Sequence, residues 1–174
     1  MVVPDASIVV AVTKPAEPQA QRALRDYYHD IGGRYHGRPM TEAEIDGILT
    51  EDADEDLQPP TGWFWVATLG ERVVGCIGLR YVTEDGTRVG EDRTRVGELT
   101  RVYVSAAVRR RGLGARLIGT VEQQAAADGV TSLRLDVRTD LVEARGLYTR
   151  HGFHEAPAFN DSPYAGHWLR KTLR

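Results

Sequence analysis

The sequence Arg-Arg-Arg-Gly-Leu-Gly-Ala at residues 109–115 decides how the chain around it folds. It follows an apolar run at 102–104 and precedes apolar residues at helical spacing, so we expect a strand, a basic turn and then a helix. Glycine allows a sharp turn and a close approach of the backbone to a ligand. The first amides of a helix have no partner within it and favour anions, and the arginines add positive charge. The segment is typical of a binding loop for a pyrophosphate.

Two common nucleotide-binding motifs do not fit this loop. A dinucleotide fingerprint needs a third glycine at position 117, which is Leu117, and a Walker loop needs Gly-Lys followed by Ser or Thr. The pattern that remains is Arg-x-x-Gly-x-Gly, formed by Arg109, Gly112 and Gly114. The alternative interpretation is a basic surface turn that happens to begin a helix.

Two further segments flank the loop. Glu-Leu-Thr-Arg-Val-Tyr-Val at 98–104 comes before it, and a strand-like run at 132–137 comes after it. That run leads to Ala-Arg-Gly-Leu-Tyr-Thr-Arg-His-Gly-Phe at 144–153, which matches Ala-x-x-Leu-Tyr-x-x-x-Gly-Phe at every position. In order and spacing, these segments resemble the GNAT superfamily of acetyltransferases over roughly residues 63–173. One departure is the stretch 138–141, which lacks the asparagine that often contacts the pantetheine arm.

The resemblance implies an α/β (α+β) fold in a single domain over residues 1–174. Its sheet should be mixed, mostly antiparallel, with about seven strands and helices on both faces. Local patterns predict strands at 8–13, 63–69, 72–81, 97–104, 132–137, 154–159 and 164–173. They predict helices at 19–30, at 41–49, at 113–129 and one ending near residue 151. Gly32-Gly33 should end the first helix, Thr41 with Glu44 forms a capping box for the second, and 83–96 should be a mobile connector.

Composition narrows the function. A net charge of −3 argues against general nucleic-acid binding, which favours a strongly basic face. The single cysteine, Cys76, lies in an apolar strand and suits a buried structural thiol in a reducing cytoplasm. No targeting or membrane segment is evident, and the histidines show no metal-ligand spacing, so we expect a cytoplasmic protein without a metal.

The cofactor implied by the resemblance is acetyl-CoA, as a co-substrate. Backbone amides of the strand at 102–104 would polarise the thioester carbonyl, and a local bulge would free them from the sheet. The residues expected to bind it are Val102, Tyr103, Val104, Arg109, Arg110, Arg111, Gly112, Leu113, Gly114, Ala115 and Tyr148.

Two residues are candidates for proton transfer. Tyr148 is the expected general acid toward the coenzyme A sulfur, because a phenol with a pKa near 10 still carries its proton at neutral pH. Glu98 is the expected general base, and alternation would place it on one face with Thr100, Val102 and Val104 unless a bulge intervenes. The structural alternatives are a core tyrosine and a solvated carboxylate or an ion pair with Arg101.

The acceptor side is less patterned. Tyr164, His167 and Trp168 could line it, with His167 a second candidate base, although aromatic residues on a terminal strand usually pack. The acidic run at 51–56 could steer a cationic acceptor, but a solvated loop is the more common role of such a run.

The resemblance implies an N-acetyltransferase that acts on a primary amine of a small molecule or peptide by direct attack in a ternary complex. Transfer of another acyl group, or a non-catalytic regulatory module that binds acyl-CoA, remains open. A nucleic-acid modifier fits the acidic balance poorly. Dimers are common in the family, so a homodimer is a further expectation, and no membrane partner is expected.

Overall fold

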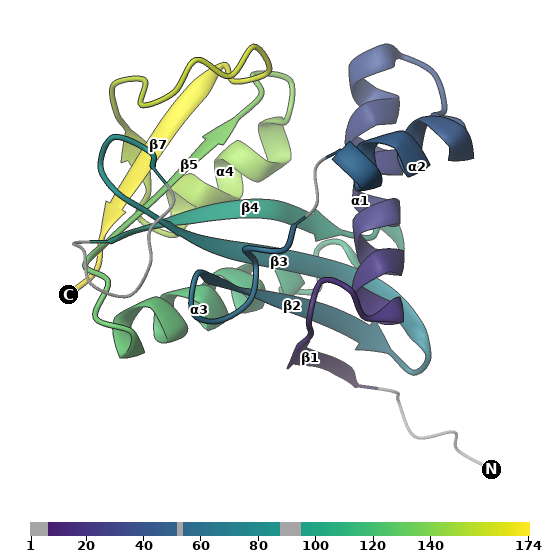
Figure 1. Cartoon of the computed structure of the whole chain (residues 1–174), viewed down its shortest axis with the longest axis horizontal. Coiled ribbons are helices and arrows are strands. Elements are labelled where there is room, and N and C mark those ends of the chain that lie inside the picture. The colour runs from purple at the N-terminus through teal and green to yellow at the C-terminus, as the bar shows by residue number, and fades with distance from the viewer. Residues whose placement is uncertain (1–6, 52–53, 88–94) are drawn as a thin grey trace.

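The fold is known from a computed structural model, which describes residues 7–51, 54–87 and 95–174. In this part of the chain, seven strands form one sheet in the order β1-β2-β3-β4-β5-β7-β6 (Figure 1). Only β4 and β5 run parallel. The strands are β1 Ile8–Val12, β2 Gly62–Leu69, β3 Arg72–Val82, β4 Val96–Val104, β5 Ser132–Val137, β6 His154–Glu155 and β7 His167–Thr172. The α-helices are α1 Pro18–His36, α2 Glu42–Glu51, α3 Leu113–Ala127 and α4 Val142–Arg150. The mixed, mostly antiparallel sheet predicted from the sequence is confirmed.

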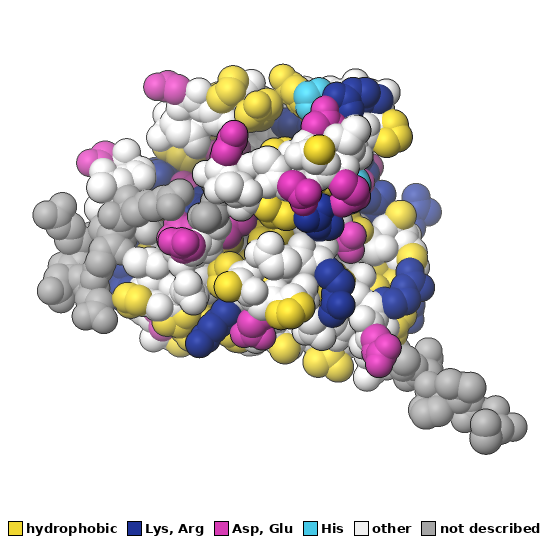
Figure 2. Space-filling model, turned by 45° about the vertical axis from the view of Figure 1, so that its right-hand side comes forward, with side chains coloured by type: hydrophobic (Ala, Val, Ile, Leu, Met, Phe, Trp, Pro, Cys, Tyr) yellow, Lys and Arg dark blue, Asp and Glu magenta, His cyan; other side chains and the backbone are white. Residues whose placement is uncertain are grey.

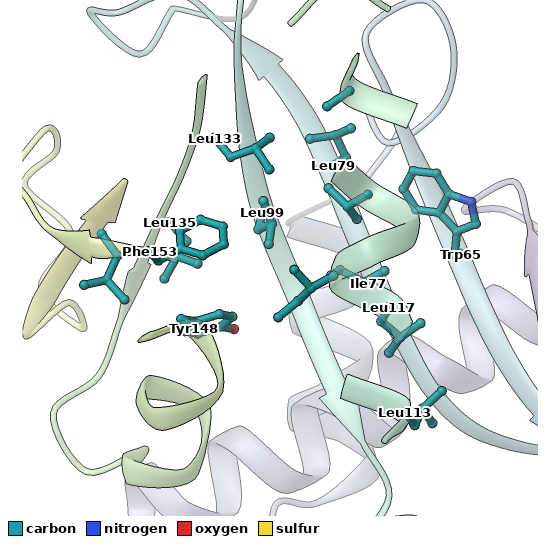
Figure 3. Packing of buried hydrophobic residues seen from close by; sticks show 14 of the residues in the cluster. Trp65, Ile77, Leu79, Leu99, Leu113, Leu117, Leu133, Leu135, Tyr148 and Phe153 are labelled. Atoms are coloured by element: carbon teal, nitrogen blue, oxygen red, sulfur yellow. The ribbon is translucent and has the colours of Figure 1, made fainter. Parts of the chain in front are cut away.

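Helices cover both faces of the sheet, as the pattern on β2 requires. Trp65 and Ala67 join the main core beneath α3 and α4, whereas Phe64 and Val66 join a second cluster beneath α1. This alternation is the two-residue period of a strand that is buried on both faces. The predicted apolar stripe of α3 is buried: Leu113, Leu117, Ile118, Val121 and Ala125 (Figure 3).

A bulge interrupts β4 where the sequence allowed for one. Cys76 pairs with Tyr103 and Gly78 pairs with Thr100, so two residues of β4 oppose the single residue between them on β3. Arg101 has φ 54°, a left-handed conformation that costs a non-glycine residue about 1–2 kcal/mol. The bulge reverses the alternation of side chains: Leu99 and Val102 both pack on the main core. Glu98 therefore does not share a face of the sheet with Val102 and Val104, as strict alternation would require.

The side chain of Arg101 fixes this bulge. Its guanidinium donates to both carboxylate oxygens of Asp54, at 3.1 and 3.3 Å, and lies over the rings of Tyr27 and Tyr28. Its backbone carbonyl accepts from the buried thiol of Cys76 at 3.2 Å. The Asp54 side chain is only 1% exposed. Asp54, with Asp56, thus packs against the sheet, so the interpretation as a solvated loop is wrong for these two residues, whereas Glu51 and Glu55 are exposed; residues 52–53 lie outside the described residues.

Arg80 on β3 extends the same ionic network. It pairs with Asp56 through Nε, approaches Asp54 at 3.7 Å and lies 4.0 Å from Glu98. These acidic residues balance arginines that the sheet buries, which explains why an acidic run folds inward.

Helix α1 is longer than predicted. It continues through Gly32-Gly33 to His36 and ends at Gly37, whose φ of 65° is the left-handed conformation of a helix terminus. Gly32 serves packing instead, since a Cβ at that position would lie 1.8 Å from the sulfur of Met40. The capping box of α2 is confirmed by reciprocal hydrogen bonds between Thr41 and Glu44.

The last strands are shorter than predicted. The strand expected at 154–159 ends after Glu155, and the one expected at 164–173 begins at His167. The segment between them carries Pro157 and Pro163, which cannot donate a backbone hydrogen bond to a sheet. Much of the connector predicted at 83–96, namely 88–94, lies outside the described residues.

Replacing Asp54 with alanine tests the clamp on the bulge. The variant should lose about 3–5 kcal/mol of unfolding free energy, because it removes the buried carboxylate that binds the guanidinium of Arg101 through two hydrogen bonds. Asp46→Ala is the matched control, since its pair with Arg25 has a carboxylate side chain that is 62% exposed and should change stability by less than about 1 kcal/mol. Urea unfolding followed by tryptophan fluorescence measures both, and equal losses would contradict the clamp.

Candidate functional site

A cavity opens where β4 and β5 separate. The two strands pair only at Gly97 with Leu133 and at Glu98 with Arg134, and beyond these pairs they diverge. The resulting cavity has a volume of about 500 Å³. Its lining includes Tyr27 and Tyr28 of α1 and also Ala144 and Tyr148 of α4, so it passes from one face of the sheet to the other. A volume of this size is typical of small-molecule sites.

The edge of β4 offers free amides to this opening. The amide of Ser105 donates to Val74 on β3, and the N–H groups of a strand alternate in direction. The amides of Val102 and Val104 therefore point away from β3, toward the side where β5 has diverged. The ring of Tyr103 packs toward α1, so only its backbone lies along this edge. The bulge that was expected to free these amides from the sheet is present.

The basic loop turns sharply into α3. A short 3₁₀ helix, Ala106–Val108, follows β4, and then Arg110 and Gly112 adopt left-handed conformations with φ of 63° and 80°. A Cβ on Gly112 would meet nothing within 4 Å, so this glycine serves the backbone turn. In the part of the chain that the structure describes, no side chain caps the N-terminus of α3. The amides of Leu113, Gly114 and Ala115 are thus left for an anion.

The three arginines of the loop differ in position. Arg109 turns back, donates to the carbonyl of Val104 and lies 3.5 Å from Asp30 of α1, so it braces the loop against the sheet. Arg110 and Arg111 are exposed. Gly114 also has a packing role: a Cβ there would lie 2.7 Å from a side-chain carbon of Leu147, so the glycine permits close packing of α3 on α4.

Tyr148 reaches the cavity from α4. Its side chain is 4% exposed and packs edge-on against Phe153, and Figure 3 shows its hydroxyl end turned toward β4. Within the described residues no hydrogen bond of this hydroxyl is found, and it is not a fully buried atom. Burial raises the pKa of Tyr148, and the nearby Tyr27 and Asp136 raise it further. The group is therefore a neutral proton donor throughout the physiological range.

Glu98 lines the same cavity but is held by arginines. One of its oxygens accepts from Arg134 at 3.0 Å, and the other lies 4.0 Å from Arg80. Arg134 itself is 1% exposed and stacks on Phe159. The expected ion-pair alternative is thus realised with Arg134 and Arg80, whereas Arg101 is engaged by Asp54.

Asp136 is a second carboxylate in the cavity, and the sequence analysis did not single it out. One of its oxygens accepts from Asn160 at 2.8 Å, and among the described residues no arginine or lysine lies within ion-pair distance. The sequence of β5 contains a pattern that could have indicated Asp136: Leu133, Leu135 and Val137 alternate with polar residues. That alternation places Asp136 on the same face as Arg134 and hence near Glu98.

The C-terminal aromatic residues are only partly gathered at the site. Tyr164 lines the cavity. His167 instead pairs with Glu155, and Trp168 donates to Asn160, which positions that amide against Asp136. Neither His167 nor Trp168 belongs to the cavity lining.

Three further features concern the surface charge, potential metal ligands and helix length. Figure 2 shows acidic and basic side chains interspersed over one face of the molecule. Within residues 7–51, 54–87 and 95–174, no cluster of three or more potential metal ligands is found. In the same ranges, no helix is long and apolar enough to span a bilayer.

Known proteins share this sequence pattern. The chain is 36% identical to human N-acetyltransferase 8 over 119 residues, which are 67% of this chain and 50% of that protein. It is 30% identical to human N-acetylaspartate synthetase over 128 residues, which are 71% of this chain and 39% of that protein. The chain therefore spans about half or less of the length of these two curated relatives.

Solved structures share the fold at low identity. An acetyltransferase of the GNAT family from Staphylococcus aureus superposes with a TM-score of 0.73 at 16% identity, covering 97% of this chain and 100% of that one. The PaiA N-acetyltransferase of Thermoplasma acidophilum, solved in complex with coenzyme A, gives 0.68 at 16%, covering 95% and 99%. The model of the acetyltransferase (GNAT) family matches residues 21–153, and with the divided sheet and the loop before α3 it shows that the chain belongs to this family.

Proposed function

We propose that the protein transfers an acetyl group from acetyl-CoA to a primary amine, by direct attack of the amine in a ternary complex. The observation that carries this proposal is the cavity that crosses the sheet between β4 and β5. It brings free strand amides, the hydroxyl of Tyr148 and two carboxylates to one space. The unit proposed to do this is a single domain over residues 1–174.

Acetyl-CoA would enter along the edge of β4. Its pyrophosphate would bind the uncapped amides at the start of α3, with Arg110 and Arg111 nearby as exposed positive charges. The thioester carbonyl would accept a hydrogen bond from a β4 amide, Val102 or Val104. A donor of this kind contributes roughly 3–4 kcal/mol of transition-state stabilisation in well-measured acyl transfers.

The chemistry consists of one bond made and one bond broken. The neutral amine nitrogen attacks the carbonyl carbon, and the collapse of the tetrahedral species breaks the C–S bond. The departing sulfur takes a proton from the hydroxyl of Tyr148, which burial keeps neutral. The nitrogen loses its extra proton to a carboxylate, directly or through water.

Two carboxylates compete for the role of base. One oxygen of Glu98 accepts from Arg134 at 3.0 Å and the other lies 4.0 Å from Arg80, so guanidinium groups on two sides hold this carboxylate in place. Asp136 is bound by a neutral amide and has one oxygen left for a proton. We therefore assign proton uptake to Asp136 and the positioning of Arg80 and Arg134 to Glu98, in place of the base role expected for Glu98.

Replacing Tyr148 with phenylalanine should lower kcat by roughly 10²-fold or more, because general acid catalysis commonly contributes this much. Binding of acetyl-CoA, measured by thermal shift or calorimetry, should stay nearly unchanged since the ring remains. In the parent protein, the raised pKa of Tyr148 predicts that kcat with saturating amine does not fall between pH 7 and about 10. Full turnover in the variant would remove the acid role, and the absence of acetyl-CoA binding in both proteins would contradict the proposed function.

Asp136→Asn and Glu98→Gln form a matched pair that locates the base. Asp136→Asn should lower kcat/KM by roughly 10²-fold at neutral pH, with partial recovery at high pH, where the amine is already neutral. Glu98→Gln should have the smaller effect and reduce thermal stability, because it removes the charge that partners Arg134. A larger loss in Glu98→Gln, with recovery at high pH, would return the base role to Glu98.

A further inference from the structure

The acceptor side of the cavity carries enough aromatic surface and charge to indicate what it accepts. Two walls meet there: the C-terminal half of α1, and the segment between β6 and β7. Both walls contribute side chains that neither the core nor the proposed acetyl transfer explains, above all Tyr35 and Tyr164.

Tyr35 and Tyr164 are large aromatic side chains exposed at 52% and 56%. Their rings meet edge-to-face with centroids 5.1 Å apart, although the two residues are far apart in the sequence. Both line the cavity. This contact joins α1 to the segment before β7 at the cavity and narrows it, which favours a free small molecule over a side chain of a folded protein.

Both walls are fixed in place by polar contacts. The guanidinium of Arg138 lies over the ring of Tyr35 at 5.1 Å and donates to the carbonyl of Ile31 in α1. On the other wall, Asn160 donates to Asp136 and accepts from Trp168, and Gly166 donates to Val137 of β5. The two tyrosines are therefore presented by supported backbone, as a preorganised binding surface requires.

The rest of this side is apolar and aromatic. Ile31, Met40 and Ile48 line it together with Tyr27 and Tyr28, whose rings also meet edge-to-face. Such a surface gains free energy by burying an apolar body.

The charges of the lining favour an acceptor with one positive charge. Three guanidinium groups line the cavity, those of Arg80, Arg101 and Arg138, and each is paired with an aspartate. Of the two lining carboxylates, Glu98 is paired with Arg134. Among the described residues that line the cavity, this leaves Asp136 as the carboxylate without an arginine partner, so the lining offers one negative partner to an incoming ammonium.

On this basis we propose that the acceptor is a small arylalkyl monoamine, whose amino group lies at Asp136 and whose aromatic body packs against Tyr35 and Tyr164. The inference rests on the proposed function, since it names the substrate class of the same site. It excludes polyamines, aminoglycosides and protein lysines as preferred acceptors.

A panel of amines at saturating acetyl-CoA, with release of the free thiol as the readout, tests this inference. Phenylethylamine should exceed n-propylamine in kcat/KM by roughly tenfold or more, because the only difference is the apolar body that is buried. Spermidine, kanamycin and a lysine-containing peptide should fall below phenylethylamine. A preference for any of these three would overturn the acceptor class while leaving acetyl transfer intact.

Variants at the two tyrosines connect the preference to the site. Tyr35→Ala and Tyr164→Ala should each raise the KM for phenylethylamine by about threefold to tenfold, with the KM for acetyl-CoA unchanged, because each removes one aromatic contact. Phenylalanine at either position should recover most of this loss, since the ring is what the proposal requires. Val142→Ala, at an exposed position outside the cavity, is the control for surface truncation.

The failures of the two proposals are distinguishable. If acetyl-CoA raises the melting temperature but no amine releases thiol, the proposed acetyl transfer fails, and the acceptor class with it. If the alanine variants raise the KM for acetyl-CoA as much as that for the amine, the tyrosines serve the fold or the cofactor, and the acceptor class alone is overturned.

Discussion

The feature on which the rest of this structure depends is one extra residue in β4. Because Arg101 and Val102 together oppose a single residue of β3, the strand bends and its alternation reverses. On its other side β4 pairs with β5 only at Gly97 and Glu98, just before the bulge, so the sheet divides there and a cavity crosses it. The division leaves strand amides without partners, which a continuous sheet would not allow. The proposed acetyl-CoA site is thus a consequence of how one strand departs from regularity.

Electrostatics maintains that departure. A left-handed arginine is unfavourable by itself, and it persists where its surroundings determine it. Here Asp54 binds the Arg101 guanidinium in the interior, and Arg80 joins the same cluster to Asp56 and Glu98. The segment after α2 that carries Asp54 is therefore tied to the strand that lines the cavity. Arg80 and Arg134 hold Glu98, which is why we assign the proposed proton uptake to Asp136.

The two sides of the cavity are built by different principles. The side proposed to bind the cofactor consists of backbone groups and one phenol, whose positions follow from β4, the turn at Gly112 and α4. The acceptor side consists of side chains, chiefly tyrosines on α1 and on the segment before β7. Backbone geometry tolerates wide changes in sequence, whereas a side-chain surface changes with each substitution. This contrast explains how solved structures only 16% identical to the chain keep the fold, and why the acceptor has to be argued from the residues of this chain.

The sequence by itself determined the family, the order of the strands and helices from 62 to 153, the turn into α3 and the position of Tyr148 at the end of α4. These follow from local patterns, in which glycines, apolar periodicity and a matched motif act over short distances. Local patterns did not predict where α1 ends or where the last two strands begin and end. Helix α1 continues through Gly32, which lets the side chain of Met40 pack closely, and the prolines near β7 limit the pairing of that strand. Tertiary structure alone decided that Asp54 is buried, that Glu98 faces Arg134 and that Asp136 faces the cavity. The physical reason is that an ion pair or a cavity wall joins residues far apart in the chain, and no local pattern records which partner a charge will meet.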